Sequence, residues 1–162
     1  MVEINDKIIF LDIDNVLNNV ETKDRTPTGF VGIDDYLVER LAEIIKATDA
    51  KIVLVSTWKQ DFIIGESYQK DQDAQYLYDK LNKFNLVVAD KTSDSFDSYH
   101  RHLGILDYLD YNKINGNYVI LDDFDYYIRG TNSRIIDHWI QTYWDEGLTK
   151  IDINKAIHIL ND

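Results

Sequence analysis

The sequence predicts an α/β fold in which a doubly wound parallel sheet lies between two layers of helices. Short apolar runs alternate along the chain with stretches of helical apolar spacing, and this alternation is typical of a parallel sheet covered on both faces. Right-handed crossovers make such a sheet doubly wound. The 162 residues suit one domain with its own core, and seven glycines and one proline leave little room for linkers. We therefore expect residues 1–162 to form a single domain.

The first three elements begin at residue 7. Residues 7–12 form a short apolar run that ends in an acid, as a buried parallel strand does. Residues 34–47 place their apolar side chains at helical spacing, and Asp34 or Asp35 can cap the start of this helix. Residues 51–56 are a second apolar run, which predicts the second buried strand.

The middle of the chain repeats this alternation. Residues 74–83 have apolar side chains on one side of a helix, and residues 86–89 predict a third strand. Residues 99–110 follow as another amphipathic helix.

The last part of the chain contains two further strands and a helix. A turn at residues 115–117 precedes the fourth strand, at residues 118–122. Residues 135–142 predict a shorter strand, and Thr149 or Asp152 then caps the last helix.

Charge and composition exclude several classes of protein. The formal net charge is -12, and a field of this sign repels nucleic-acid backbones, so we expect no extended nucleic-acid-binding surface. The chain has no cysteine, which excludes disulfides and thiolate metal sites. Its first residues resemble neither a signal peptide nor a membrane span, so we expect a cytoplasmic protein without a membrane partner. The oligomeric state stays open.

Acidic residues follow two of the expected strands. Asp12 and Asp14 come at the end of the first strand, and Asp122 and Asp123 at the end of the fourth. In a parallel sheet these strand ends share one edge, where closely spaced carboxylates raise one another's pKa values unless a cation is present. An all-oxygen cluster without cysteine or histidine favours Mg²⁺ as the cofactor.

Hydroxyl and basic side chains complete the expected site. Ser56 closes the second strand and Thr57 follows it, and a hydroxyl with a nearby backbone N–H suits a phosphoryl oxygen. A basic group is also needed to balance charge in the transition state. Arg101 is the first choice for this role, with Lys59 and Lys113 in reserve.

This order of motifs resembles the haloacid-dehalogenase (HAD) superfamily. The acid-x-acid motif lies in residues 10–17, the Ser/Thr motif in residues 53–57, the basic residue is Arg101, and the acid pair ends residues 119–123. The resemblance implies a Rossmannoid three-layer α/β/α fold with no cap or a minimal one.

Within the superfamily the chain is similar to the small HAD domain of RNA-repair proteins. The similarity rests on Leu-Asp-Ile-Asp-x-Val-Leu-Asn, on Val-Leu-x-Ser-x-Trp-Lys around Trp58, and on Arg101 four residues before Ile105. It continues through residues 118–123 and ends at residues 147–149.

The resemblance implies a two-step phosphoryl transfer. Asp12 would attack phosphorus to form an aspartyl-phosphate, and Asp14 would act as general acid and then as general base. Mg²⁺ would be held by Asp12, the backbone carbonyl of Asp14, and either Asp122 or Asp123.

The resemblance also implies a phosphate site and an open entrance. Ser56, Thr57 and Arg101 would hold the phosphoryl oxygens together with Asn15, which stands where the family often has glycine. The only segments that could form a lid are residues 18–33 and 60–73, and a site this open suits end phosphates of nucleotides or polynucleotides.

Two other functions use the same residue types. A receiver-type signalling domain also has an acidic pair, Mg²⁺ and an aspartyl-phosphate, but it places the phosphoacceptor after the third strand and a lysine later. A regulatory module could keep the metal and phosphate site without turnover. The favoured partner is a phosphorylated small molecule or a nucleic-acid end, and no residue pattern identifies it further.

Overall fold

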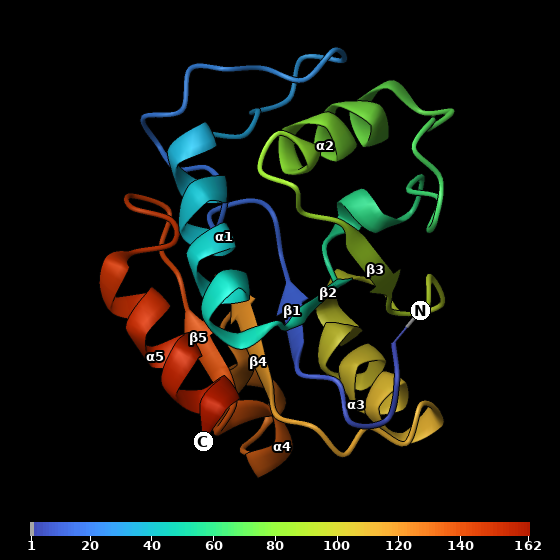
Figure 1. Ribbon diagram of the computed structural model, residues 1–162, viewed down its shortest axis with the longest axis vertical. Helices are drawn as coiled ribbons and strands as arrows, with labels where there is room; N and C mark the ends of the chain where they lie inside the picture. Colours follow the sequence, from blue (N-terminus) through green and yellow to red (C-terminus); the bar gives the residue numbers. More distant parts are fainter. Residues whose placement is uncertain (1) are drawn as a thin grey trace.

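The computed structural model describes residues 2–162 and contains one five-stranded parallel sheet (Figure 1). The strands lie in the order β3-β2-β1-β4-β5, and every neighbouring pair is parallel. This arrangement confirms the predicted doubly wound α/β fold. The strands are β1 (Ile8–Leu11), β2 (Lys51–Leu54), β3 (Val88–Lys91), β4 (Tyr118–Asp122) and β5 (Trp139–Gln141).

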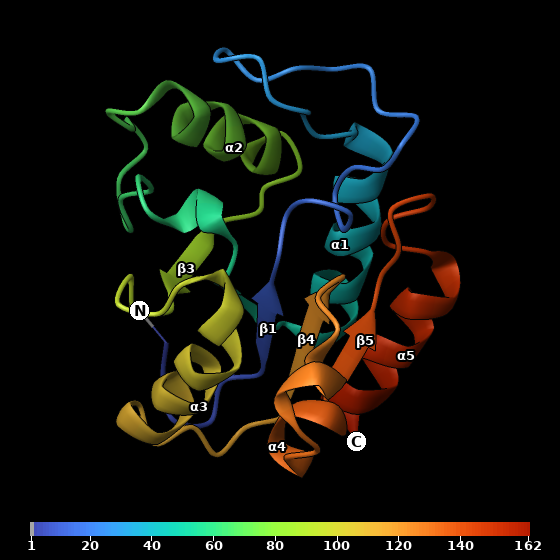
Figure 2. The same ribbon diagram turned by 180° about the vertical axis from the view of Figure 1, so that it is seen from behind.

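Helices cover both faces of the sheet, as Figures 1 and 2 show from opposite sides: α1 and α5 lie on one face, and α3 and α4 on the other. The helices are α1 (Asp35–Thr48), α2 (Gln72–Asn82), α3 (Arg101–Tyr111), α4 (Ser133–Ile136) and α5 (Lys150–Asn161). Among the described residues, three short 3₁₀ turns each lie between a strand and the helix that follows it: η1 (Thr57–Lys59), η2 (Ser98–His100) and η3 (Tyr126–Arg129).

The side chains of β1 show why the fold has three layers. Ile9 and Leu11 pack into a core cluster with α1, α2 and α5, whereas Ile8 and Phe10 pack into a second cluster with α3 and α4. All four side chains are fully buried, so both faces of the strand are covered. A strand buried on both faces needs a continuous apolar run rather than an alternating one, and that is the pattern in the sequence.

Element boundaries differ from expectation at a few positions. The stretch of residues 135–142 holds the end of α4 as well as β5, so the strand is shorter than expected. Asp34 occupies the N-cap position of α1, but its carboxylate accepts a hydrogen bond from the Thr22 hydroxyl instead of capping the helix. Thr149 and Asp152 act together, because each side chain accepts from the other's backbone N–H in a capping box.

The two candidate lid segments lie beyond the carboxyl ends of the strands. In Figures 1 and 2 the segment after β1 arches beside α2. The Tyr76 hydroxyl of α2 donates to Asp24 and accepts from the backbone N–H of Ile33 at 2.9 Å. The backbone N–H of Thr28 donates to Asp73 at 3.2 Å, which ties the tip of the loop to the same helix.

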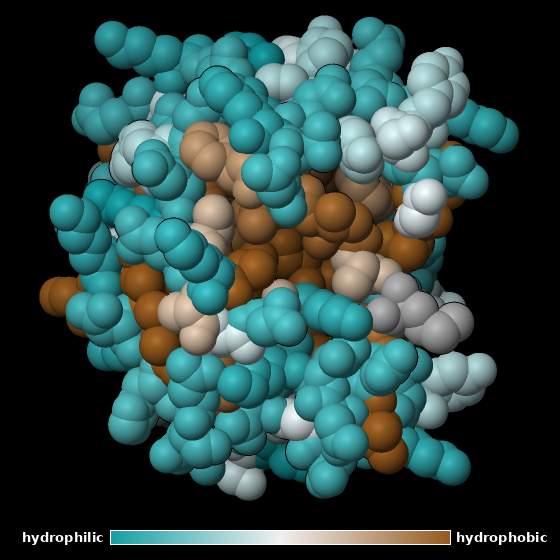
Figure 3. Space-filling view, in the orientation of Figure 1, coloured by the Kyte–Doolittle hydropathy of each residue, from teal (hydrophilic) through white to brown (hydrophobic). Residues whose placement is uncertain are grey.

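The face seen in Figure 3 has a hydrophobic patch near its centre, between α1 and α2. A shallow hollow of about 360 Å³ lies where α1 ends and β2 and β3 begin, and its apolar lining includes Ile45, Ile52, Ile64, Leu86 and Val87.

No described helix combines the length and the apolar composition that crossing a lipid bilayer requires.

Candidate active site

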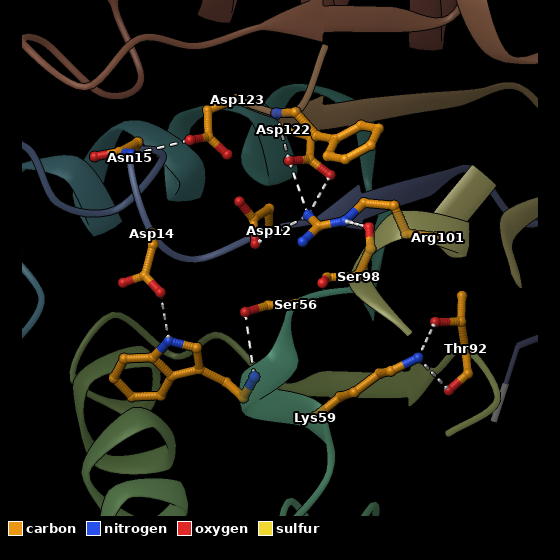
Figure 4. Close-up of polar contacts among 12 residues, drawn as sticks. Asp12, Asp14, Asn15, Ser56, Lys59, Thr92, Ser98, Arg101, Asp122 and Asp123 are labelled. Atoms are coloured by element: carbon orange, nitrogen blue, oxygen red, sulfur yellow. Dashed lines mark hydrogen bonds and ion pairs between the residues drawn. The ribbon is translucent and has the colours of Figure 1, made fainter. Parts of the chain in front are cut away.

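Three carboxylates meet at the carboxyl edge of the sheet. Asp12 directly follows β1, Asp122 ends β4, and these two strands are neighbours in the sheet. Asp123 follows, and one oxygen from each of the three side chains lies within 4.8 Å of the other two. Asp12 and Asp122 are buried, and Figure 4 shows the three side chains converging. The structure therefore brings together the acids that the sequence assigns to two separate strands.

Arg101, the first residue of α3, lies against these acids. Its Nη1 donates to both oxygens of Asp122, at 3.0 and 2.8 Å, and is 3.5 Å from Oδ1 of Asp12. Burial disfavours the charged guanidinium, but the charges of Asp122 and Asp12 outweigh it and raise the pKa of Arg101. The guanidinium also lies over the Phe124 ring. Lys113 lies beyond the other end of α3, at the opposite edge of the sheet from Asp12.

Asp122 is saturated with hydrogen bonds from the protein. Oδ1 accepts from Arg101 and from the backbone N–H of Phe124 at 3.0 Å, and Oδ2 accepts from Arg101 and from the Tyr126 hydroxyl at 2.8 Å. Each oxygen thus accepts two bonds, the usual capacity of a carboxylate oxygen. Sequence reasoning missed Tyr126, because a tyrosine four residues after an acid carries no signal of its own.

The electrostatics of the three acids favour a bound cation. Burial raises the pKa of Asp12 well above its ordinary value, and the nearby charge of Asp122 adds to this, while Arg101 acts in the opposite direction. One guanidinium therefore contacts two buried carboxylates, and the third, Asp123, lies close to both of them. The donor set consists of oxygen atoms alone, which suits Mg²⁺ rather than zinc or copper, so the residues present fit the expected metal.

Asp14 lies at the mouth of the site, outside this group of three. Its Oδ1 accepts from Nδ2 of Asn18 at 3.0 Å, and its Oδ2 accepts from the indole Nε1 of Trp58 at 3.2 Å. Two donors from different segments thus orient this carboxylate, and Figure 4 shows the bond from the indole. Trp58 has a place in the second motif, but its hydrogen bond to Asp14 had no sequence signal.

Asn15 has a conformation that explains its residue type. Its φ is 61°, in the left-handed region that asparagine tolerates better than most residues other than glycine. Its side-chain Nδ2 donates to Oδ2 of Asp123 at 2.9 Å, and its backbone N–H donates to Asn18 at 2.6 Å. In this structure the Asn15 amide therefore positions an acid of the site.

Gly147 supports the same loop from the far end of the sequence. Its φ is +68°, and a Cβ at this position would lie 2.9 Å from the carbonyl oxygen of Asn18 and 3.0 Å from that of Val16. The backbone N–H of Leu148 donates to the Val16 carbonyl at 2.9 Å. Only glycine permits this approach, which connects residues 147–149 to the loop that carries Asp14.

The hydroxyl residues and Lys59 follow β2. Ser56 is buried, and its Oγ accepts from the backbone N–H of Trp58 at 3.3 Å, which leaves its own O–H available to donate. Thr57 is exposed at the start of η1. The ammonium group of Lys59 points away from the acids and donates to the hydroxyl of Thr92 at 2.9 Å (Figure 4). Of the three basic candidates, Arg101 is the one in contact with Asp12.

A comparison with protein families identifies the architecture. The sequence model of the HAD domain in Swiss Army Knife RNA repair proteins matches residues 8–153, a range that contains all four motifs and the three clustered acids. Searches of curated proteins and of solved structures find no match. The family is a branch of the haloacid-dehalogenase superfamily, whose members include phosphatase-type hydrolases. Because the match covers most of its length, the chain belongs to the family of HAD domains found in Swiss Army Knife RNA repair proteins.

Proposed function

We propose that the protein is a Mg²⁺-dependent phosphohydrolase that removes end phosphates from nucleotides or polynucleotides through Asp12. The observation that carries this proposal is the group of Asp12, Asp122 and Asp123, the first two buried and in contact with Arg101, at the carboxyl edge of a parallel sheet. Such an edge is where doubly wound folds bind their ligands.

Asp12, the backbone carbonyl of Asp14, and Asp123 would hold the metal. Asp123 is favoured over Asp122 because every acceptor position of Asp122 is already used by protein donors. Oδ2 of Asp123 accepts from Asn15, and Oδ1 accepts no hydrogen bond from the described residues. When bound, Mg²⁺ supplies positive charge that stabilises negative charge on the phosphoryl oxygens.

The side chains of the chain itself account for both steps. In the first, an oxygen of Asp12 bonds to phosphorus, the bond from phosphorus to the ester oxygen breaks, and the protonated Asp14 gives its proton to the departing oxygen. The products are an alcohol and an aspartyl-phosphate on Asp12. In the second, Asp14 takes a proton from water as that water attacks phosphorus, which releases phosphate and restores both acids. Asn18 and Trp58 keep Asp14 oriented for both transfers.

The phosphoryl oxygens would be held by Ser56, Thr57 and Arg101. The Ser56 hydroxyl has its proton free to donate, and Nη2 of Arg101 donates to no residue that the structure describes. Arg101 can therefore keep Asp122 in place through Nη1 while Nη2 reaches the phosphoryl group. The rigid, planar guanidinium can serve both partners at once, because its N–H donors point in fixed directions.

The test is phosphate release from a panel of phosphorylated metabolites, nucleotides and oligonucleotides with a 5′- or 3′-phosphate. We expect Mg²⁺-dependent release from several esters, abolished in Asp12→Asn, which keeps the shape of the side chain but removes the nucleophile. Asp107→Asn, at an exposed position of α3, is the matched control and should keep full activity.

Two outcomes would refute this function. Mg²⁺ binding without hydrolysis of any ester would indicate a regulatory module that lacks turnover. Labelling by acetyl phosphate that persists for minutes would indicate a receiver-type signalling domain.

A further inference from the structure

We infer that the cavity beside Asp14 binds the leaving group of the ester, and that this group is a nucleoside: an aromatic ring with N–H donors, without a second phosphate. This inference rests on the proposed phosphohydrolase function and narrows its substrates from nucleotides or polynucleotides to nucleoside monophosphates, because the leaving group of a polynucleotide carries further phosphates.

The position of the cavity connects it to the reaction. It has a volume of about 670 Å³ and lies between the loop at residues 28–31, η1 and the start of α2, with Asp14 in its wall. This volume lies within the range of about 300–1,000 Å³ that is usual for small-molecule sites. A general acid must be in hydrogen-bond reach of the departing oxygen. A leaving group whose oxygen contacts Asp14 would therefore extend into this cavity.

Aromatic and apolar side chains form part of the wall. The Trp58 indole is half-buried and is held by its bond to Asp14 and by the neighbouring Tyr76 ring, 6.4 Å away between centroids. Phe30 and Val31 come from the loop and are 68% and 41% exposed, so they contribute little to the protein core. Aromatic side chains such as those of Trp58 and Phe30 can stack on any nucleobase.

Carboxylates make up most of the polar part of the wall, and no basic side chain is among the described residues that line it. Besides Asp14 these are Asp61, Asp71 and Asp73. Asp71 caps α2 through Oδ2 alone, and Asp61 accepts no hydrogen bond from the described residues. Free carboxylate oxygens accept from the amino and imino groups of a base. The same charges repel a second phosphate, which distinguishes a nucleoside from a leaving group that carries one.

The experiment compares kcat/KM for four esters with Mg²⁺: adenosine 5′-monophosphate, adenosine 3′-monophosphate, ribose 5-phosphate and adenosine 3′,5′-bisphosphate. At least one monophosphate should exceed ribose 5-phosphate by about fivefold or more, the lower end of what base stacking contributes. The bisphosphate should be several-fold poorer than that monophosphate. Free adenosine should also quench tryptophan fluorescence on binding, and ribose should not.

Two variants with matched controls assign these effects to the cavity. Phe30→Ala should remove most of the preference for the ring and weaken adenosine binding, whereas Tyr111→Ala, at an exposed aromatic residue on α3, should change neither. Asp61→Asn should raise the relative kcat/KM for the bisphosphate, and Asp107→Asn should not.

The outcomes separate this inference from the proposed function. If hydrolysis depends on Asp12 but kcat/KM is the same for the adenosine monophosphates and for ribose 5-phosphate, the inference is wrong and the proposed phosphohydrolase function stands. Adenosine binding that Phe30→Ala weakens, without hydrolysis of any ester, would support the cavity as a nucleoside site and refute the phosphohydrolase. If adenosine does not bind and kcat/KM shows no preference for the ring, the cavity is not a nucleoside site.

Discussion

The bond from the Tyr126 hydroxyl to Asp122 can be removed without disturbing the packing around it. Tyr126→Phe deletes one oxygen and keeps the ring, which packs edge-on against Phe124 and Trp139 at centroid distances of 5.1 and 5.4 Å. The lost bond is 2.8 Å long and ends on a carboxylate oxygen. The two residues are 1% and 0% exposed, so water cannot easily replace the donor.

The magnitude follows from these facts. A hydrogen bond to a charged group contributes about 1.5–3 kcal/mol to the free energy of unfolding. Arg101 and the Phe124 N–H still bind Asp122, so the carboxylate stays partly satisfied and the fold should persist. For a protein of this size the loss corresponds to a decrease in Tm of about 3–12 °C.

The assay is equilibrium denaturation by urea at pH 7 with a chelator, so that no metal contributes. Tyr127→Phe is the matched control, because Tyr127 is 60% exposed and its hydroxyl forms no hydrogen bond with the described residues. The control should change the free energy of unfolding by less than about 0.5 kcal/mol. Equal midpoints for Tyr126→Phe and the wild type would show that this bond does not stabilise Asp122.

Three further predictions concern the metal, pH and a close backbone contact. Mg²⁺ should raise Tm of the wild type by mass action, and Asp123→Asn should abolish this rise in a thermal shift titration. Burial and the charge of Asp122 raise the pKa of Asp12 in the folded, metal-free protein, so between the unfolded and folded pKa values the folded state keeps a proton that the unfolded state has released. The stability that this proton contributes is fully present below the unfolded pKa of about 4 and is lost as pH rises through the folded pKa. Asp12→Asn should remove this loss, so its stability relative to the wild type should increase with pH in denaturation measurements with chelator; a constant difference would contradict this. Gly147→Ala should cost about 1–3 kcal/mol in the same measurement, because its Cβ would meet the Asn18 carbonyl at a positive φ, and an unchanged midpoint would refute the contact.

The parts of the fold that the sequence predicted well depend on local composition. The runs at residues 7–12 and 118–122 are apolar without alternation, and they became strands buried on both faces. The prediction was weaker at residues 135–142, where short segments of helix and strand follow one another. In segments this short, packing against neighbouring elements decides the conformation more than intrinsic propensity does.

The sequence by itself determined the α/β class and the presence of acids at two strand ends, because burial patterns and parallel strand direction depend on residues close together in the chain. Only the tertiary structure decided which acid has all its acceptor positions filled by hydrogen bonds, which basic residue contacts Asp12, and which side chains orient Asp14. These contacts join residues far apart in sequence, such as Trp58 with Asp14 and Arg101 with Asp122. Their formation depends on how whole helices and loops pack, and no local pattern in the chain records that geometry.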